Sequence, residues 1–385
     1  MTNILYIGAF IPDVIVKESR GSIDSLYRDE QALIEGFRNL QGVKIDVVTS
    51  PDLPSYPKYL LYIKKRELRD EGVLLIPSLN LPIIKHFWTI VTICKEASKI
   101  INSNEGTTNV IIPYVVFRHV MAARLIKWFC GKRVKVCTIV PDIFFPKNRF
   151  RRLVNKITER KAIKNDMFVL YTEAMADYLR IKDKAHIVIE GFHLVDINHD
   201  VNPPKEKFSI VYSGSLNARY GILRLIEAVM KIDRSNVELR IFGSGDSEQK
   251  IREYSKVDDR IQFFGRVSKK EASEILYNAS VLVNPRGPYD GEYVQYSFPS
   301  KDIDYLASGI PAILCRLPGM PEAYLGHFVD AGDGSVECLN RAIMEVYNMS
   351  DVERKQMGES AKKFIAMRMD PVNQAREIVE MFNEN

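Results

Sequence analysis

The segment best suited to chemistry covers residues 298–311 and reads FPSKDIDYLASGIP. Pro299 and Ser300 begin a run with helical spacing, which a Gly-x-Pro ends. Unpaired backbone N–H groups and the helix dipole favour an anion at such a start, and the cation of Lys301 adds to this preference. Asp304 lies about 5 Å further along the helix axis, where its carboxylate can accept hydrogen bonds from two sugar hydroxyls. A phosphate at the helix start and hydroxyls one turn away describe a nucleoside diphosphate sugar.

Length and composition indicate a two-domain globular protein. A chain of 385 residues exceeds the size at which one hydrophobic core usually stops growing, so two domains are expected. The fractions of hydrophobic residues, 46%, and of charged residues, 27%, are ordinary for a folded protein. The net charge of +5 is modest, and we expect no nucleic-acid partner.

The sequence also predicts where the protein works. It enters an apolar strand at once, without the basic and apolar regions of a signal peptide, and it contains no apolar run of roughly 18 residues that would span a bilayer. Its five cysteines form no CxxC pair, and its histidines and carboxylates lack the spacing of a metal site. We therefore expect a cytoplasmic protein with reduced thiols and with no bound metal or cofactor.

Strand and helix patterns alternate along the chain, which is typical of α/β domains with parallel sheets. A first set contains apolar strands such as NILYIGAF and a helix over 22–40, and a polar, proline-containing stretch separates it from a second set. We expect two doubly wound, Rossmann-like domains, 1–197 and 207–368, facing across a cleft. A final helix over 371–385 is expected to pack back on the first domain. In such domains ligands bind at the carboxyl ends of the strands.

Three loops of the second half carry residues suited to a ligand. The loop SGSLNARYG contains Gly214, Ser215 and Asn217, and it places Arg219 just before a helix. Its glycine lets the backbone approach a ligand, its polar side chains offer hydrogen bonds, and its guanidinium offers a fork of donors to a phosphate. GSG and GRV turns follow the next two strands. Taken alone, each of these glycines is better explained by a tight strand-to-helix turn.

Together with FPSKDIDYLASG, the order and spacing of these loops resemble the carboxy-terminal donor domain of GT-B glycosyltransferases. The resemblance is to the family-4-like retaining group that makes bacterial surface polysaccharides, and it covers residues 209–334. The first half resembles the acceptor domain in architecture only. The resemblance implies that residues of all four loops contact the donor, namely Gly214, Ser215, Asn217, Gly243, Gly245, Arg266, Val267, Tyr296, Pro299, Ser300 and Asp304.

The resemblance implies a role for each group of these residues. The glycine loop, Ser300 and Lys301 would bind the diphosphate, and Asp304 would hold the ribose hydroxyls. The turns after the next two strands would border the base. Arg219 and Lys301 would be catalytic, because they can stabilise the charge of the leaving diphosphate without a metal.

The chain departs from the family pattern at the donor site. The Glu-x7-Glu pattern of many members would place its acids where this chain has Tyr296 and Asp304. One carboxylate is therefore absent and the other is shorter, which affects contacts to the transferred sugar. The usual Arg and Lys of the glycine loop are replaced by Ser215 and an Arg-Tyr pair, so one cation fewer lies beside the phosphates. We expect Lys301 to compensate.

The first half offers candidates for the acceptor side. Gly21 and Ser22 lie in a region that is close to the donor phosphates in the family, although an ordinary loop and helix N-cap explain them equally well. Asp142 stands in a Pro-Asp pair where many relatives have His-Asp, so it is our candidate for contacting the acceptor hydroxyl as a base. A turn aspartate is the equal alternative. His119 is a candidate for the cleft, but a position on a helix surface is the stronger expectation.

One segment of the first half is strongly basic. Residues 147–164, KNRFRRLVNKITERKAIK, contain eight basic side chains and one acid, and Phe150, Leu153, Val154 and Ile157 fall at helical spacing. A helix with an apolar stripe and a cationic face suits an anionic membrane surface that carries a lipid-linked acceptor. A solvated helix that packs on its own domain is the common alternative.

These observations lead to one predicted function and two alternatives. We expect a cytoplasmic enzyme, peripheral on the inner face of the membrane, that transfers a hexosyl group from a nucleoside diphosphate sugar to a glycan or lipid-linked acceptor in polysaccharide biosynthesis. The resemblance implies that the anomeric configuration is retained. A sugar-nucleotide epimerase of the same architecture would need more acids and histidines in these loops. A non-catalytic, two-lobed sugar-binding protein would have no use for a phosphate site.

Overall fold

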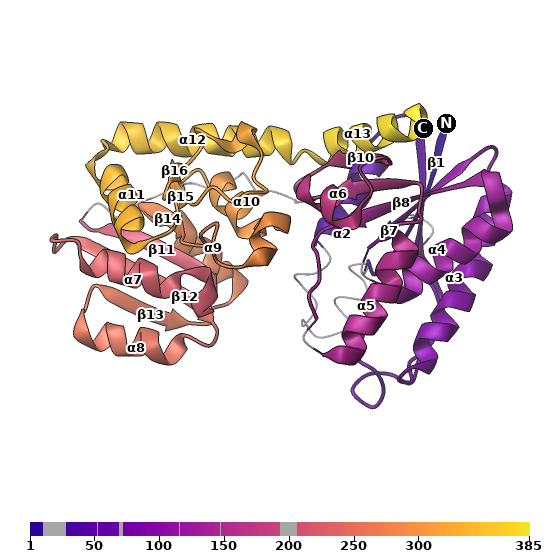
Figure 1. The fold of residues 1–385 in the computed structure, drawn as a ribbon, viewed down its shortest axis with the longest axis horizontal. Helices are drawn as coiled ribbons and strands as arrows, with labels where there is room; N and C mark the ends of the chain where they lie inside the picture. The colour runs from indigo at the N-terminus through magenta and orange to yellow at the C-terminus, as the bar shows by residue number, and fades with distance from the viewer. Residues whose placement is uncertain (11–27, 52, 69–71, 115, 147, 193–205) are drawn as a thin grey trace. The chain divides into compact units, whose positions relative to one another are not determined.

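The chain folds into two compact units, seen in Figure 1. The computed structural model describes residues 1–10, 28–51, 53–68, 72–114, 116–146, 148–192 and 206–385. Unit 1 comprises Met1–Leu194 and Met369–Asn385, and unit 2 comprises Val195–Arg368. The expected linker over 198–207 falls almost entirely outside the described residues.

Unit 1 is built on an eight-stranded sheet in the order β10-β9-β8-β7-β1-β2-β5-β4. Neighbouring strands are parallel, except that β4 is antiparallel to β5. The strands are β1 (Thr2–Gly8), β2 (Val43–Thr49), β4 (Arg66–Leu68), β5 (Val73–Leu75), β7 (Thr108–Pro113), β8 (Val134–Val140), β9 (Met167–Leu170) and β10 (Ala185–Val188). A separate antiparallel pair joins β3 (Tyr62–Ile63) to β6 (Ser78–Leu79). Continuous burial along β1 and β8 explains why these strands read as apolar runs rather than as alternating patterns.

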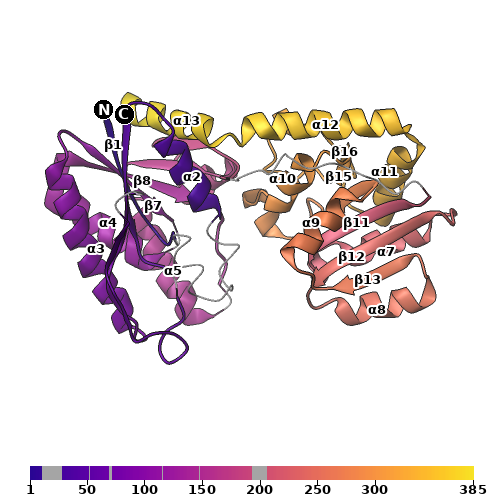
Figure 2. The same ribbon diagram turned by 180° about the vertical axis from the view of Figure 1, so that it is seen from behind.

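Helices α3, α4 and α5 of unit 1 pack side by side, and α2 packs against α13 (Figure 2). The helical segments are α2 (Arg28–Arg38), α3 (Ile84–Ser103), α4 (Phe117–Cys130), η2 (Gly131–Arg133), α5 (Arg149–Ala162), α6 (Ala174–Leu179) and α13 (Pro371–Glu384). The first residues of the helix expected over 22–40 lie outside the described part, and α2 ends at Arg38. A Cβ added at Gly36 would lie 2.1 Å from the carbonyl oxygen of Pro371, so glycine permits the close contact between α2 and α13.

Unit 2 contains a six-stranded parallel sheet in the order β13-β12-β11-β14-β15-β16. Its strands are β11 (Phe208–Ser215), β12 (Val237–Ser244), β13 (Ile261–Gly265), β14 (Val281–Asn284), β15 (Ala312–Leu314) and β16 (Val329–Asp330). The order 3-2-1-4-5-6 is that of doubly wound dinucleotide-binding sheets, in which the strand order reverses between the first and fourth strands. Ligands bind at this switch point, outside the carboxyl ends of β11 and β14.

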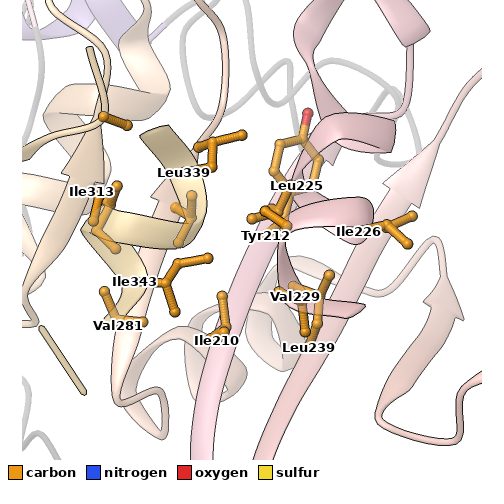
Figure 3. Close-up of a cluster of buried hydrophobic side chains, with 14 of the residues drawn as sticks. Ile210, Tyr212, Leu225, Ile226, Val229, Leu239, Val281, Ile313, Leu339 and Ile343 are labelled. Carbon is orange, nitrogen blue, oxygen red and sulfur yellow. The ribbon is translucent and has the colours of Figure 1, made fainter. Parts of the chain in front are cut away.

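The helical segments of unit 2 are η3 (Ala218–Tyr220), α7 (Ile222–Met230), α8 (Glu248–Val257), α9 (Lys269–Tyr277), η4 (Glu292–Tyr296), α10 (Ser300–Ala307), η5 (Glu322–Tyr324), α11 (Val336–Asn348) and α12 (Asp351–Arg368). Figure 3 shows part of the core, in which apolar side chains of α7 and α11 meet those of the strands. Leu225, Ile226 and Val229 lie on one face of α7 because of their helical spacing, and all three are fully buried. This packing fixes the strand ends from which the loops emerge.

The predicted α/β class with two doubly wound domains is confirmed by both sheet orders. Within the described ranges, no helix is both long enough and apolar enough to cross a bilayer.

Candidate functional site

Two glycine loops meet at the carboxyl edge of the sheet in unit 2. A Cβ added at Gly243 would lie 1.8 Å from the carbonyl oxygen of Gly214, and one added at Gly245 would lie 2.5 Å from the backbone of Leu216. Gly214 and Gly243 also have positive φ angles, 146° and 132°. Any larger residue at either position in the second loop would push the loops apart, so close packing of neighbouring turns explains these glycines.

Lys301 extends from the start of α10 beneath the glycine loop. Its Nζ lies 3.8 Å from the ring centroid of Tyr212 and 2.6 Å from where a Cβ on Gly214 would be. Burial is the main cause that lowers the pKa of Lys301 to about 7; the charges of Asp302 and Asp304 oppose this shift, and the charge of Arg286 adds to it. Within the described ranges, its ammonium forms no hydrogen bond or ion pair. A poorly solvated cation without an ion-pair partner is unfavourable by itself and favours binding of an anion.

The start of α10 leaves backbone donors available. The helix begins at Ser300 after the N-cap residue Pro299, which provides no side-chain cap. Asp304, one turn in, is exposed, and the side chain of Ser300 is exposed as well. The features predicted from FPSKDIDYLASG therefore occur together: a helix start, a cation and an accessible carboxylate. Tyr296 lies at the end of η4, in the segment that leads to this helix.

Asp302 fixes α10 to the sheet, a role that was not predicted from the sequence. It is almost completely buried, and its Oδ1 accepts a 2.6 Å hydrogen bond from Nδ2 of Asn284 at the end of β14. Burial raises the pKa of Asp302 to about 6. Asp302 lies on the inward face of α10 beside the apolar Ile303, and this position in the sequence could have indicated that its carboxyl is buried. Asp302 thus holds Lys301 at the strand ends.

The side chains of the glycine loop are partly paired with one another. Asn217 donates a 2.6 Å hydrogen bond from Nδ2 to Oγ of Ser215. Arg219 is exposed and stacks on Tyr220 and Tyr293, with its guanidinium carbon 4.8 Å and 5.3 Å from the two ring centroids. The aromatic faces hold this cation at the loop's end without neutralising it.

Arg286, also missed from the sequence, is the second cation of the site and is partly buried. It follows β14, and its guanidinium carbon lies 4.6 Å from the ring centroid of Tyr293 and 5.6 Å from that of Tyr220. Its Nε and Nη2 atoms are buried and have no hydrogen-bond partner among the described residues. The signal for it was its position: an arginine immediately after a buried strand and a proline, at the edge where ligands bind.

The turns predicted to border the base lie at β12 and β13. Val267 lines a groove of about 530 Å³ together with Phe242 and Phe264, whose rings stack with centroids 4.6 Å apart. Arg266 is exposed beside this groove. An aromatic groove next to the glycine loops offers a flat apolar surface of the kind on which a nucleobase can stack.

Comparison with known proteins places this site in a family. Residues 207–349 match the family model described as glycosyl transferases group 1. We call this matched segment the group 1 domain. No curated protein matches the sequence. The predicted glycosyltransferase class is thereby confirmed at the level of this domain, which contains Lys301, Arg286 and both glycine loops.

Solved structures resemble the whole chain in fold. The lipopolysaccharide outer core galactosyltransferase WaaB, in its apo form, has a TM-score of 0.62 and 14% identity over 97% of this chain and 99% of its own. HepE of Anabaena, in complex with UDP, has a TM-score of 0.63 and 12% identity over the full length of both chains. Sucrose-phosphate synthase of Thermosynechococcus elongatus has a TM-score of 0.62 and 14% identity over 99% of this chain and 98% of that chain. The predicted GT-B fold, of which the group 1 domain is the second half, is confirmed.

Outside the group 1 domain, His119 differs from its expected position. It is completely buried on α4 rather than exposed on a helix surface, so that expectation is wrong. Its Nε2 lies 2.7 Å from Oγ of Ser50, a side chain that also accepts a 3.3 Å hydrogen bond from Nε of Arg118. Burial, and then the charge of Arg118, hold the pKa of His119 well below its usual value. A neutral histidine in this position joins α4 to the end of β2.

The roles expected for the other candidates of unit 1 stay predictions. Asp142 follows β8 and is exposed, and its Oδ1 accepts a 2.8 Å hydrogen bond from the backbone N–H of Ile143, as in a turn. An accessible carboxylate that stabilises its own turn is compatible with both expectations for Asp142, a base that contacts the acceptor hydroxyl and an aspartate of an ordinary turn. Gly21 and Ser22 lie outside the described residues.

Proposed function

We propose that the protein transfers a hexosyl group from a nucleoside diphosphate sugar to a glycan or lipid-linked acceptor, with retention of configuration and without a metal. The observation that carries this proposal is a pair of partly buried cations, Lys301 and Arg286, that form no ion pair among the described residues and lie at the switch point of a group 1 domain. Two neighbouring positive charges in a poorly solvated site favour a ligand with at least two negative charges. A diphosphate meets that requirement.

The same groups can assist the chemical step. When the bond between the sugar and the diphosphate breaks, negative charge grows on the leaving phosphate. Lys301, the backbone N–H groups at the start of α10 and the exposed Arg219 can stabilise this charge. These donors are held in place before the reaction, because Asp302 anchors the helix and the tyrosine rings hold the arginine. Positive side chains can therefore do the work that a divalent cation does in other transferases.

Known relatives of the fold support the choice of donor. HepE was crystallised with UDP, and WaaB is described as a galactosyltransferase of the lipopolysaccharide outer core. These properties belong to those proteins. They make UDP the first nucleotide to test here, and they make a surface polysaccharide a reasonable class of product.

The proposal includes docking on an anionic membrane through α5. Phe150, Leu153 and Ile157 on this helix are 73%, 57% and 40% exposed, so most of the apolar stripe is accessible to a bilayer. Arg151, Arg152 and Lys156 are exposed on the same helix. A surface that combines apolar and cationic side chains in this way complements a bilayer of acidic lipids.

A second apolar surface lies at the same edge of the unit 1 sheet. Because β7 and β8 are parallel, α4 and α5, which follow them, start at the carboxyl edge, and the start of α3 lies there as well, beside Ser50 and Arg118. Exposed apolar side chains of this region are Leu60, Leu61, Tyr62, Ile83, Ile84, Phe87, Trp88 and Val91. Lys58 and Lys64 are exposed among them. Together with α5, they form what we call the carboxyl-edge surface.

A binding and transfer experiment tests the proposed function. The thermal midpoint of the protein is measured with UDP, GDP, dTDP and ADP in EDTA, and the matching sugar nucleotides are then incubated with membrane extracts. We expect at least one diphosphate to raise the midpoint, and its sugar nucleotide to yield a glycosylated product with the donor's anomeric configuration. If none of the four diphosphates stabilises the folded protein, the proposal fails. Conversion of the donor to an epimer without transfer would favour the epimerase instead.

A further inference from the structure

The loop over 285–290 occupies the second side of the switch point in unit 2. β14, which precedes it, pairs directly with β11, which precedes the glycine loop. The two loops therefore emerge side by side at the carboxyl edge, although about 70 residues separate them in the chain. A ligand bound at the glycine loop lies next to the loop over 285–290.

This loop is held rigidly by Arg224 of α7. The guanidinium donates from Nη2 to the carbonyl oxygen of Pro285 at 3.2 Å and to Oδ2 of Asp290 at 2.7 Å, and from Nε to the carbonyl oxygen of Gly334 at 2.7 Å. Oδ2 of Asp290 also accepts a 2.7 Å hydrogen bond from the backbone N–H of Gly287. One arginine thus joins both ends of the loop to a third segment.

The loop that Arg224 holds in place carries Arg286, and the guanidinium of Arg286 has N–H donors without hydrogen-bond partners among the described residues. Tyr293 and Tyr220 lie against its guanidinium and restrict its orientation. Nε and Nη2 of Arg286 and the hydroxyl of Tyr293 are all buried, and none has a hydrogen-bond partner in the part of the chain that the structure describes. Buried donors without partners are uncommon in folded proteins, and their clustering at a ligand-binding edge indicates that a ligand satisfies them.

We propose that Arg286 binds a phosphate of the donor diphosphate and so replaces the cation that the glycine loop lacks at Ser215. The inference rests on the proposed function and adds to it a residue that the family pattern does not indicate. A guanidinium can bind two phosphate oxygens at once, and stacking on tyrosine fixes the plane of that fork. Lys301 then acts as a point charge on one side of the diphosphate and Arg286 as a planar clamp on the other.

The test compares Arg286→Gln with a matched control. Arg252→Gln also removes an arginine that stacks on an aromatic ring in unit 2, 4.6 Å from the centroid of Phe263, but it lies on the exposed face of α8. Affinities for the diphosphate that stabilises the unaltered protein, and for its monophosphate, are measured by calorimetry. We expect Arg286→Gln to weaken diphosphate binding at least tenfold, Arg286→Lys to weaken it less, and Arg252→Gln to change it less than twofold.

The outcomes separate this inference from the function on which it rests. If the unaltered protein binds a diphosphate and folded Arg286→Gln binds it equally well, Arg286 is not a ligand residue, and only this inference falls. If the unaltered protein binds none, both proposals fall together. An equal loss for the monophosphate places Arg286 on the phosphate next to the nucleoside, and a loss confined to the diphosphate places it on the phosphate next to the sugar. Either pattern supports the contact.

Discussion

The carboxyl edges of the two parallel sheets expose opposite chemistry. In unit 2 this edge carries glycine turns, buried cations and unpaired donors. In unit 1 it carries exposed apolar side chains interspersed with lysines and arginines. Since both sheets have the same doubly wound order around their first strand, the architecture decides where a ligand binds, and the side chains at the strand ends decide which ligand it is.

The largest expected effect concerns Lys301 of unit 2. Lys301→Met keeps the length of the side chain and removes its charge. We expect diphosphate affinity to fall by about a hundredfold or more, because a charge-assisted contact in a poorly solvated site is lost. The ligand-free variant should be as stable as the unaltered protein, or more stable, because an unpaired buried charge is gone. Calorimetry and thermal denaturation measure both quantities.

The exposed lysine in the last turn of α8 provides the control for that experiment. Lys256→Met makes the same chemical change at the end of the helix far from the glycine loop and should alter neither quantity. If Lys301→Met bound the diphosphate with unchanged affinity, Lys301 would not be a phosphate ligand, and the proposed chemical difference between the carboxyl edges of the two sheets would be wrong.

The next effect concerns the carboxyl-edge surface of unit 1. Phe87→Ser combined with Phe150→Ser should weaken binding to vesicles that contain phosphatidylglycerol, by about tenfold for each aromatic side chain removed. Sedimentation with vesicles measures this binding, and vesicles of phosphatidylcholine alone should bind the unaltered protein weakly. Diphosphate affinity should not change.

Two exposed aromatic residues at the other end of α4 supply a matched control. Trp128 and Phe129 are 74% and 68% exposed, yet they lie at the carboxyl end of the helix, away from the carboxyl edge of the sheet. Trp128→Ser with Phe129→Ser should leave vesicle binding intact. Equal losses in both double variants would mean that exposed aromatic side chains act without regard to their position.

The smallest effect is a pH dependence that unit 2 should show. Because burial lowers the pKa of Lys301 to about 7, the free protein must take up a proton before it can bind an anion at higher pH. Above pH 7.5 we expect diphosphate affinity to fall by up to about tenfold per pH unit. Calorimetry in buffers of different ionisation enthalpy should detect proton uptake on binding. Lys301→Met should abolish the dependence.

The same pKa shift has a defined effect on stability. The unfolded chain binds a proton at Lys301 up to its ordinary pKa of about 10.4, whereas the folded chain releases it near 7. The unfolded state therefore holds more protons between these values, and the contribution of Lys301 to the free energy of unfolding rises with pH across that window. A contribution that falls with pH would contradict the burial of this amine.

The sequence predicted the fold and the local structure of one segment of the candidate site because both are encoded locally. Apolar runs in β1 and β8 mark buried strands, and the FPSKDIDYLASG segment contains the proline, lysine and carboxylate of one helix start within a few residues. Such signals need no knowledge of distant contacts. The alternation of strands and helices then leaves few topologies to consider.

The remaining residues could not be predicted because their roles depend on strand order. Arg286 matters because β14 lies beside β11, and nothing near it in the chain indicates that neighbour. His119 carries a titratable group that usually indicates an accessible position, but pairing with Ser50 across the sheet edge lets α4 bury it. Asp302 is hidden for the same reason, since its partner Asn284 belongs to another strand.

The path of the chain has a consequence for engineering. The polypeptide begins in unit 1, passes through unit 2 and returns, and α13 buries Ala375, Ile378, Met381 and Phe382 as part of unit 1. Unit 2 is therefore an insertion with both of its ends attached to the same neighbour. A chimaera that exchanges unit 2 between proteins of this fold must be spliced at two places, near 194 and near 368, since a single crossover would leave α2 covered by a foreign terminal helix.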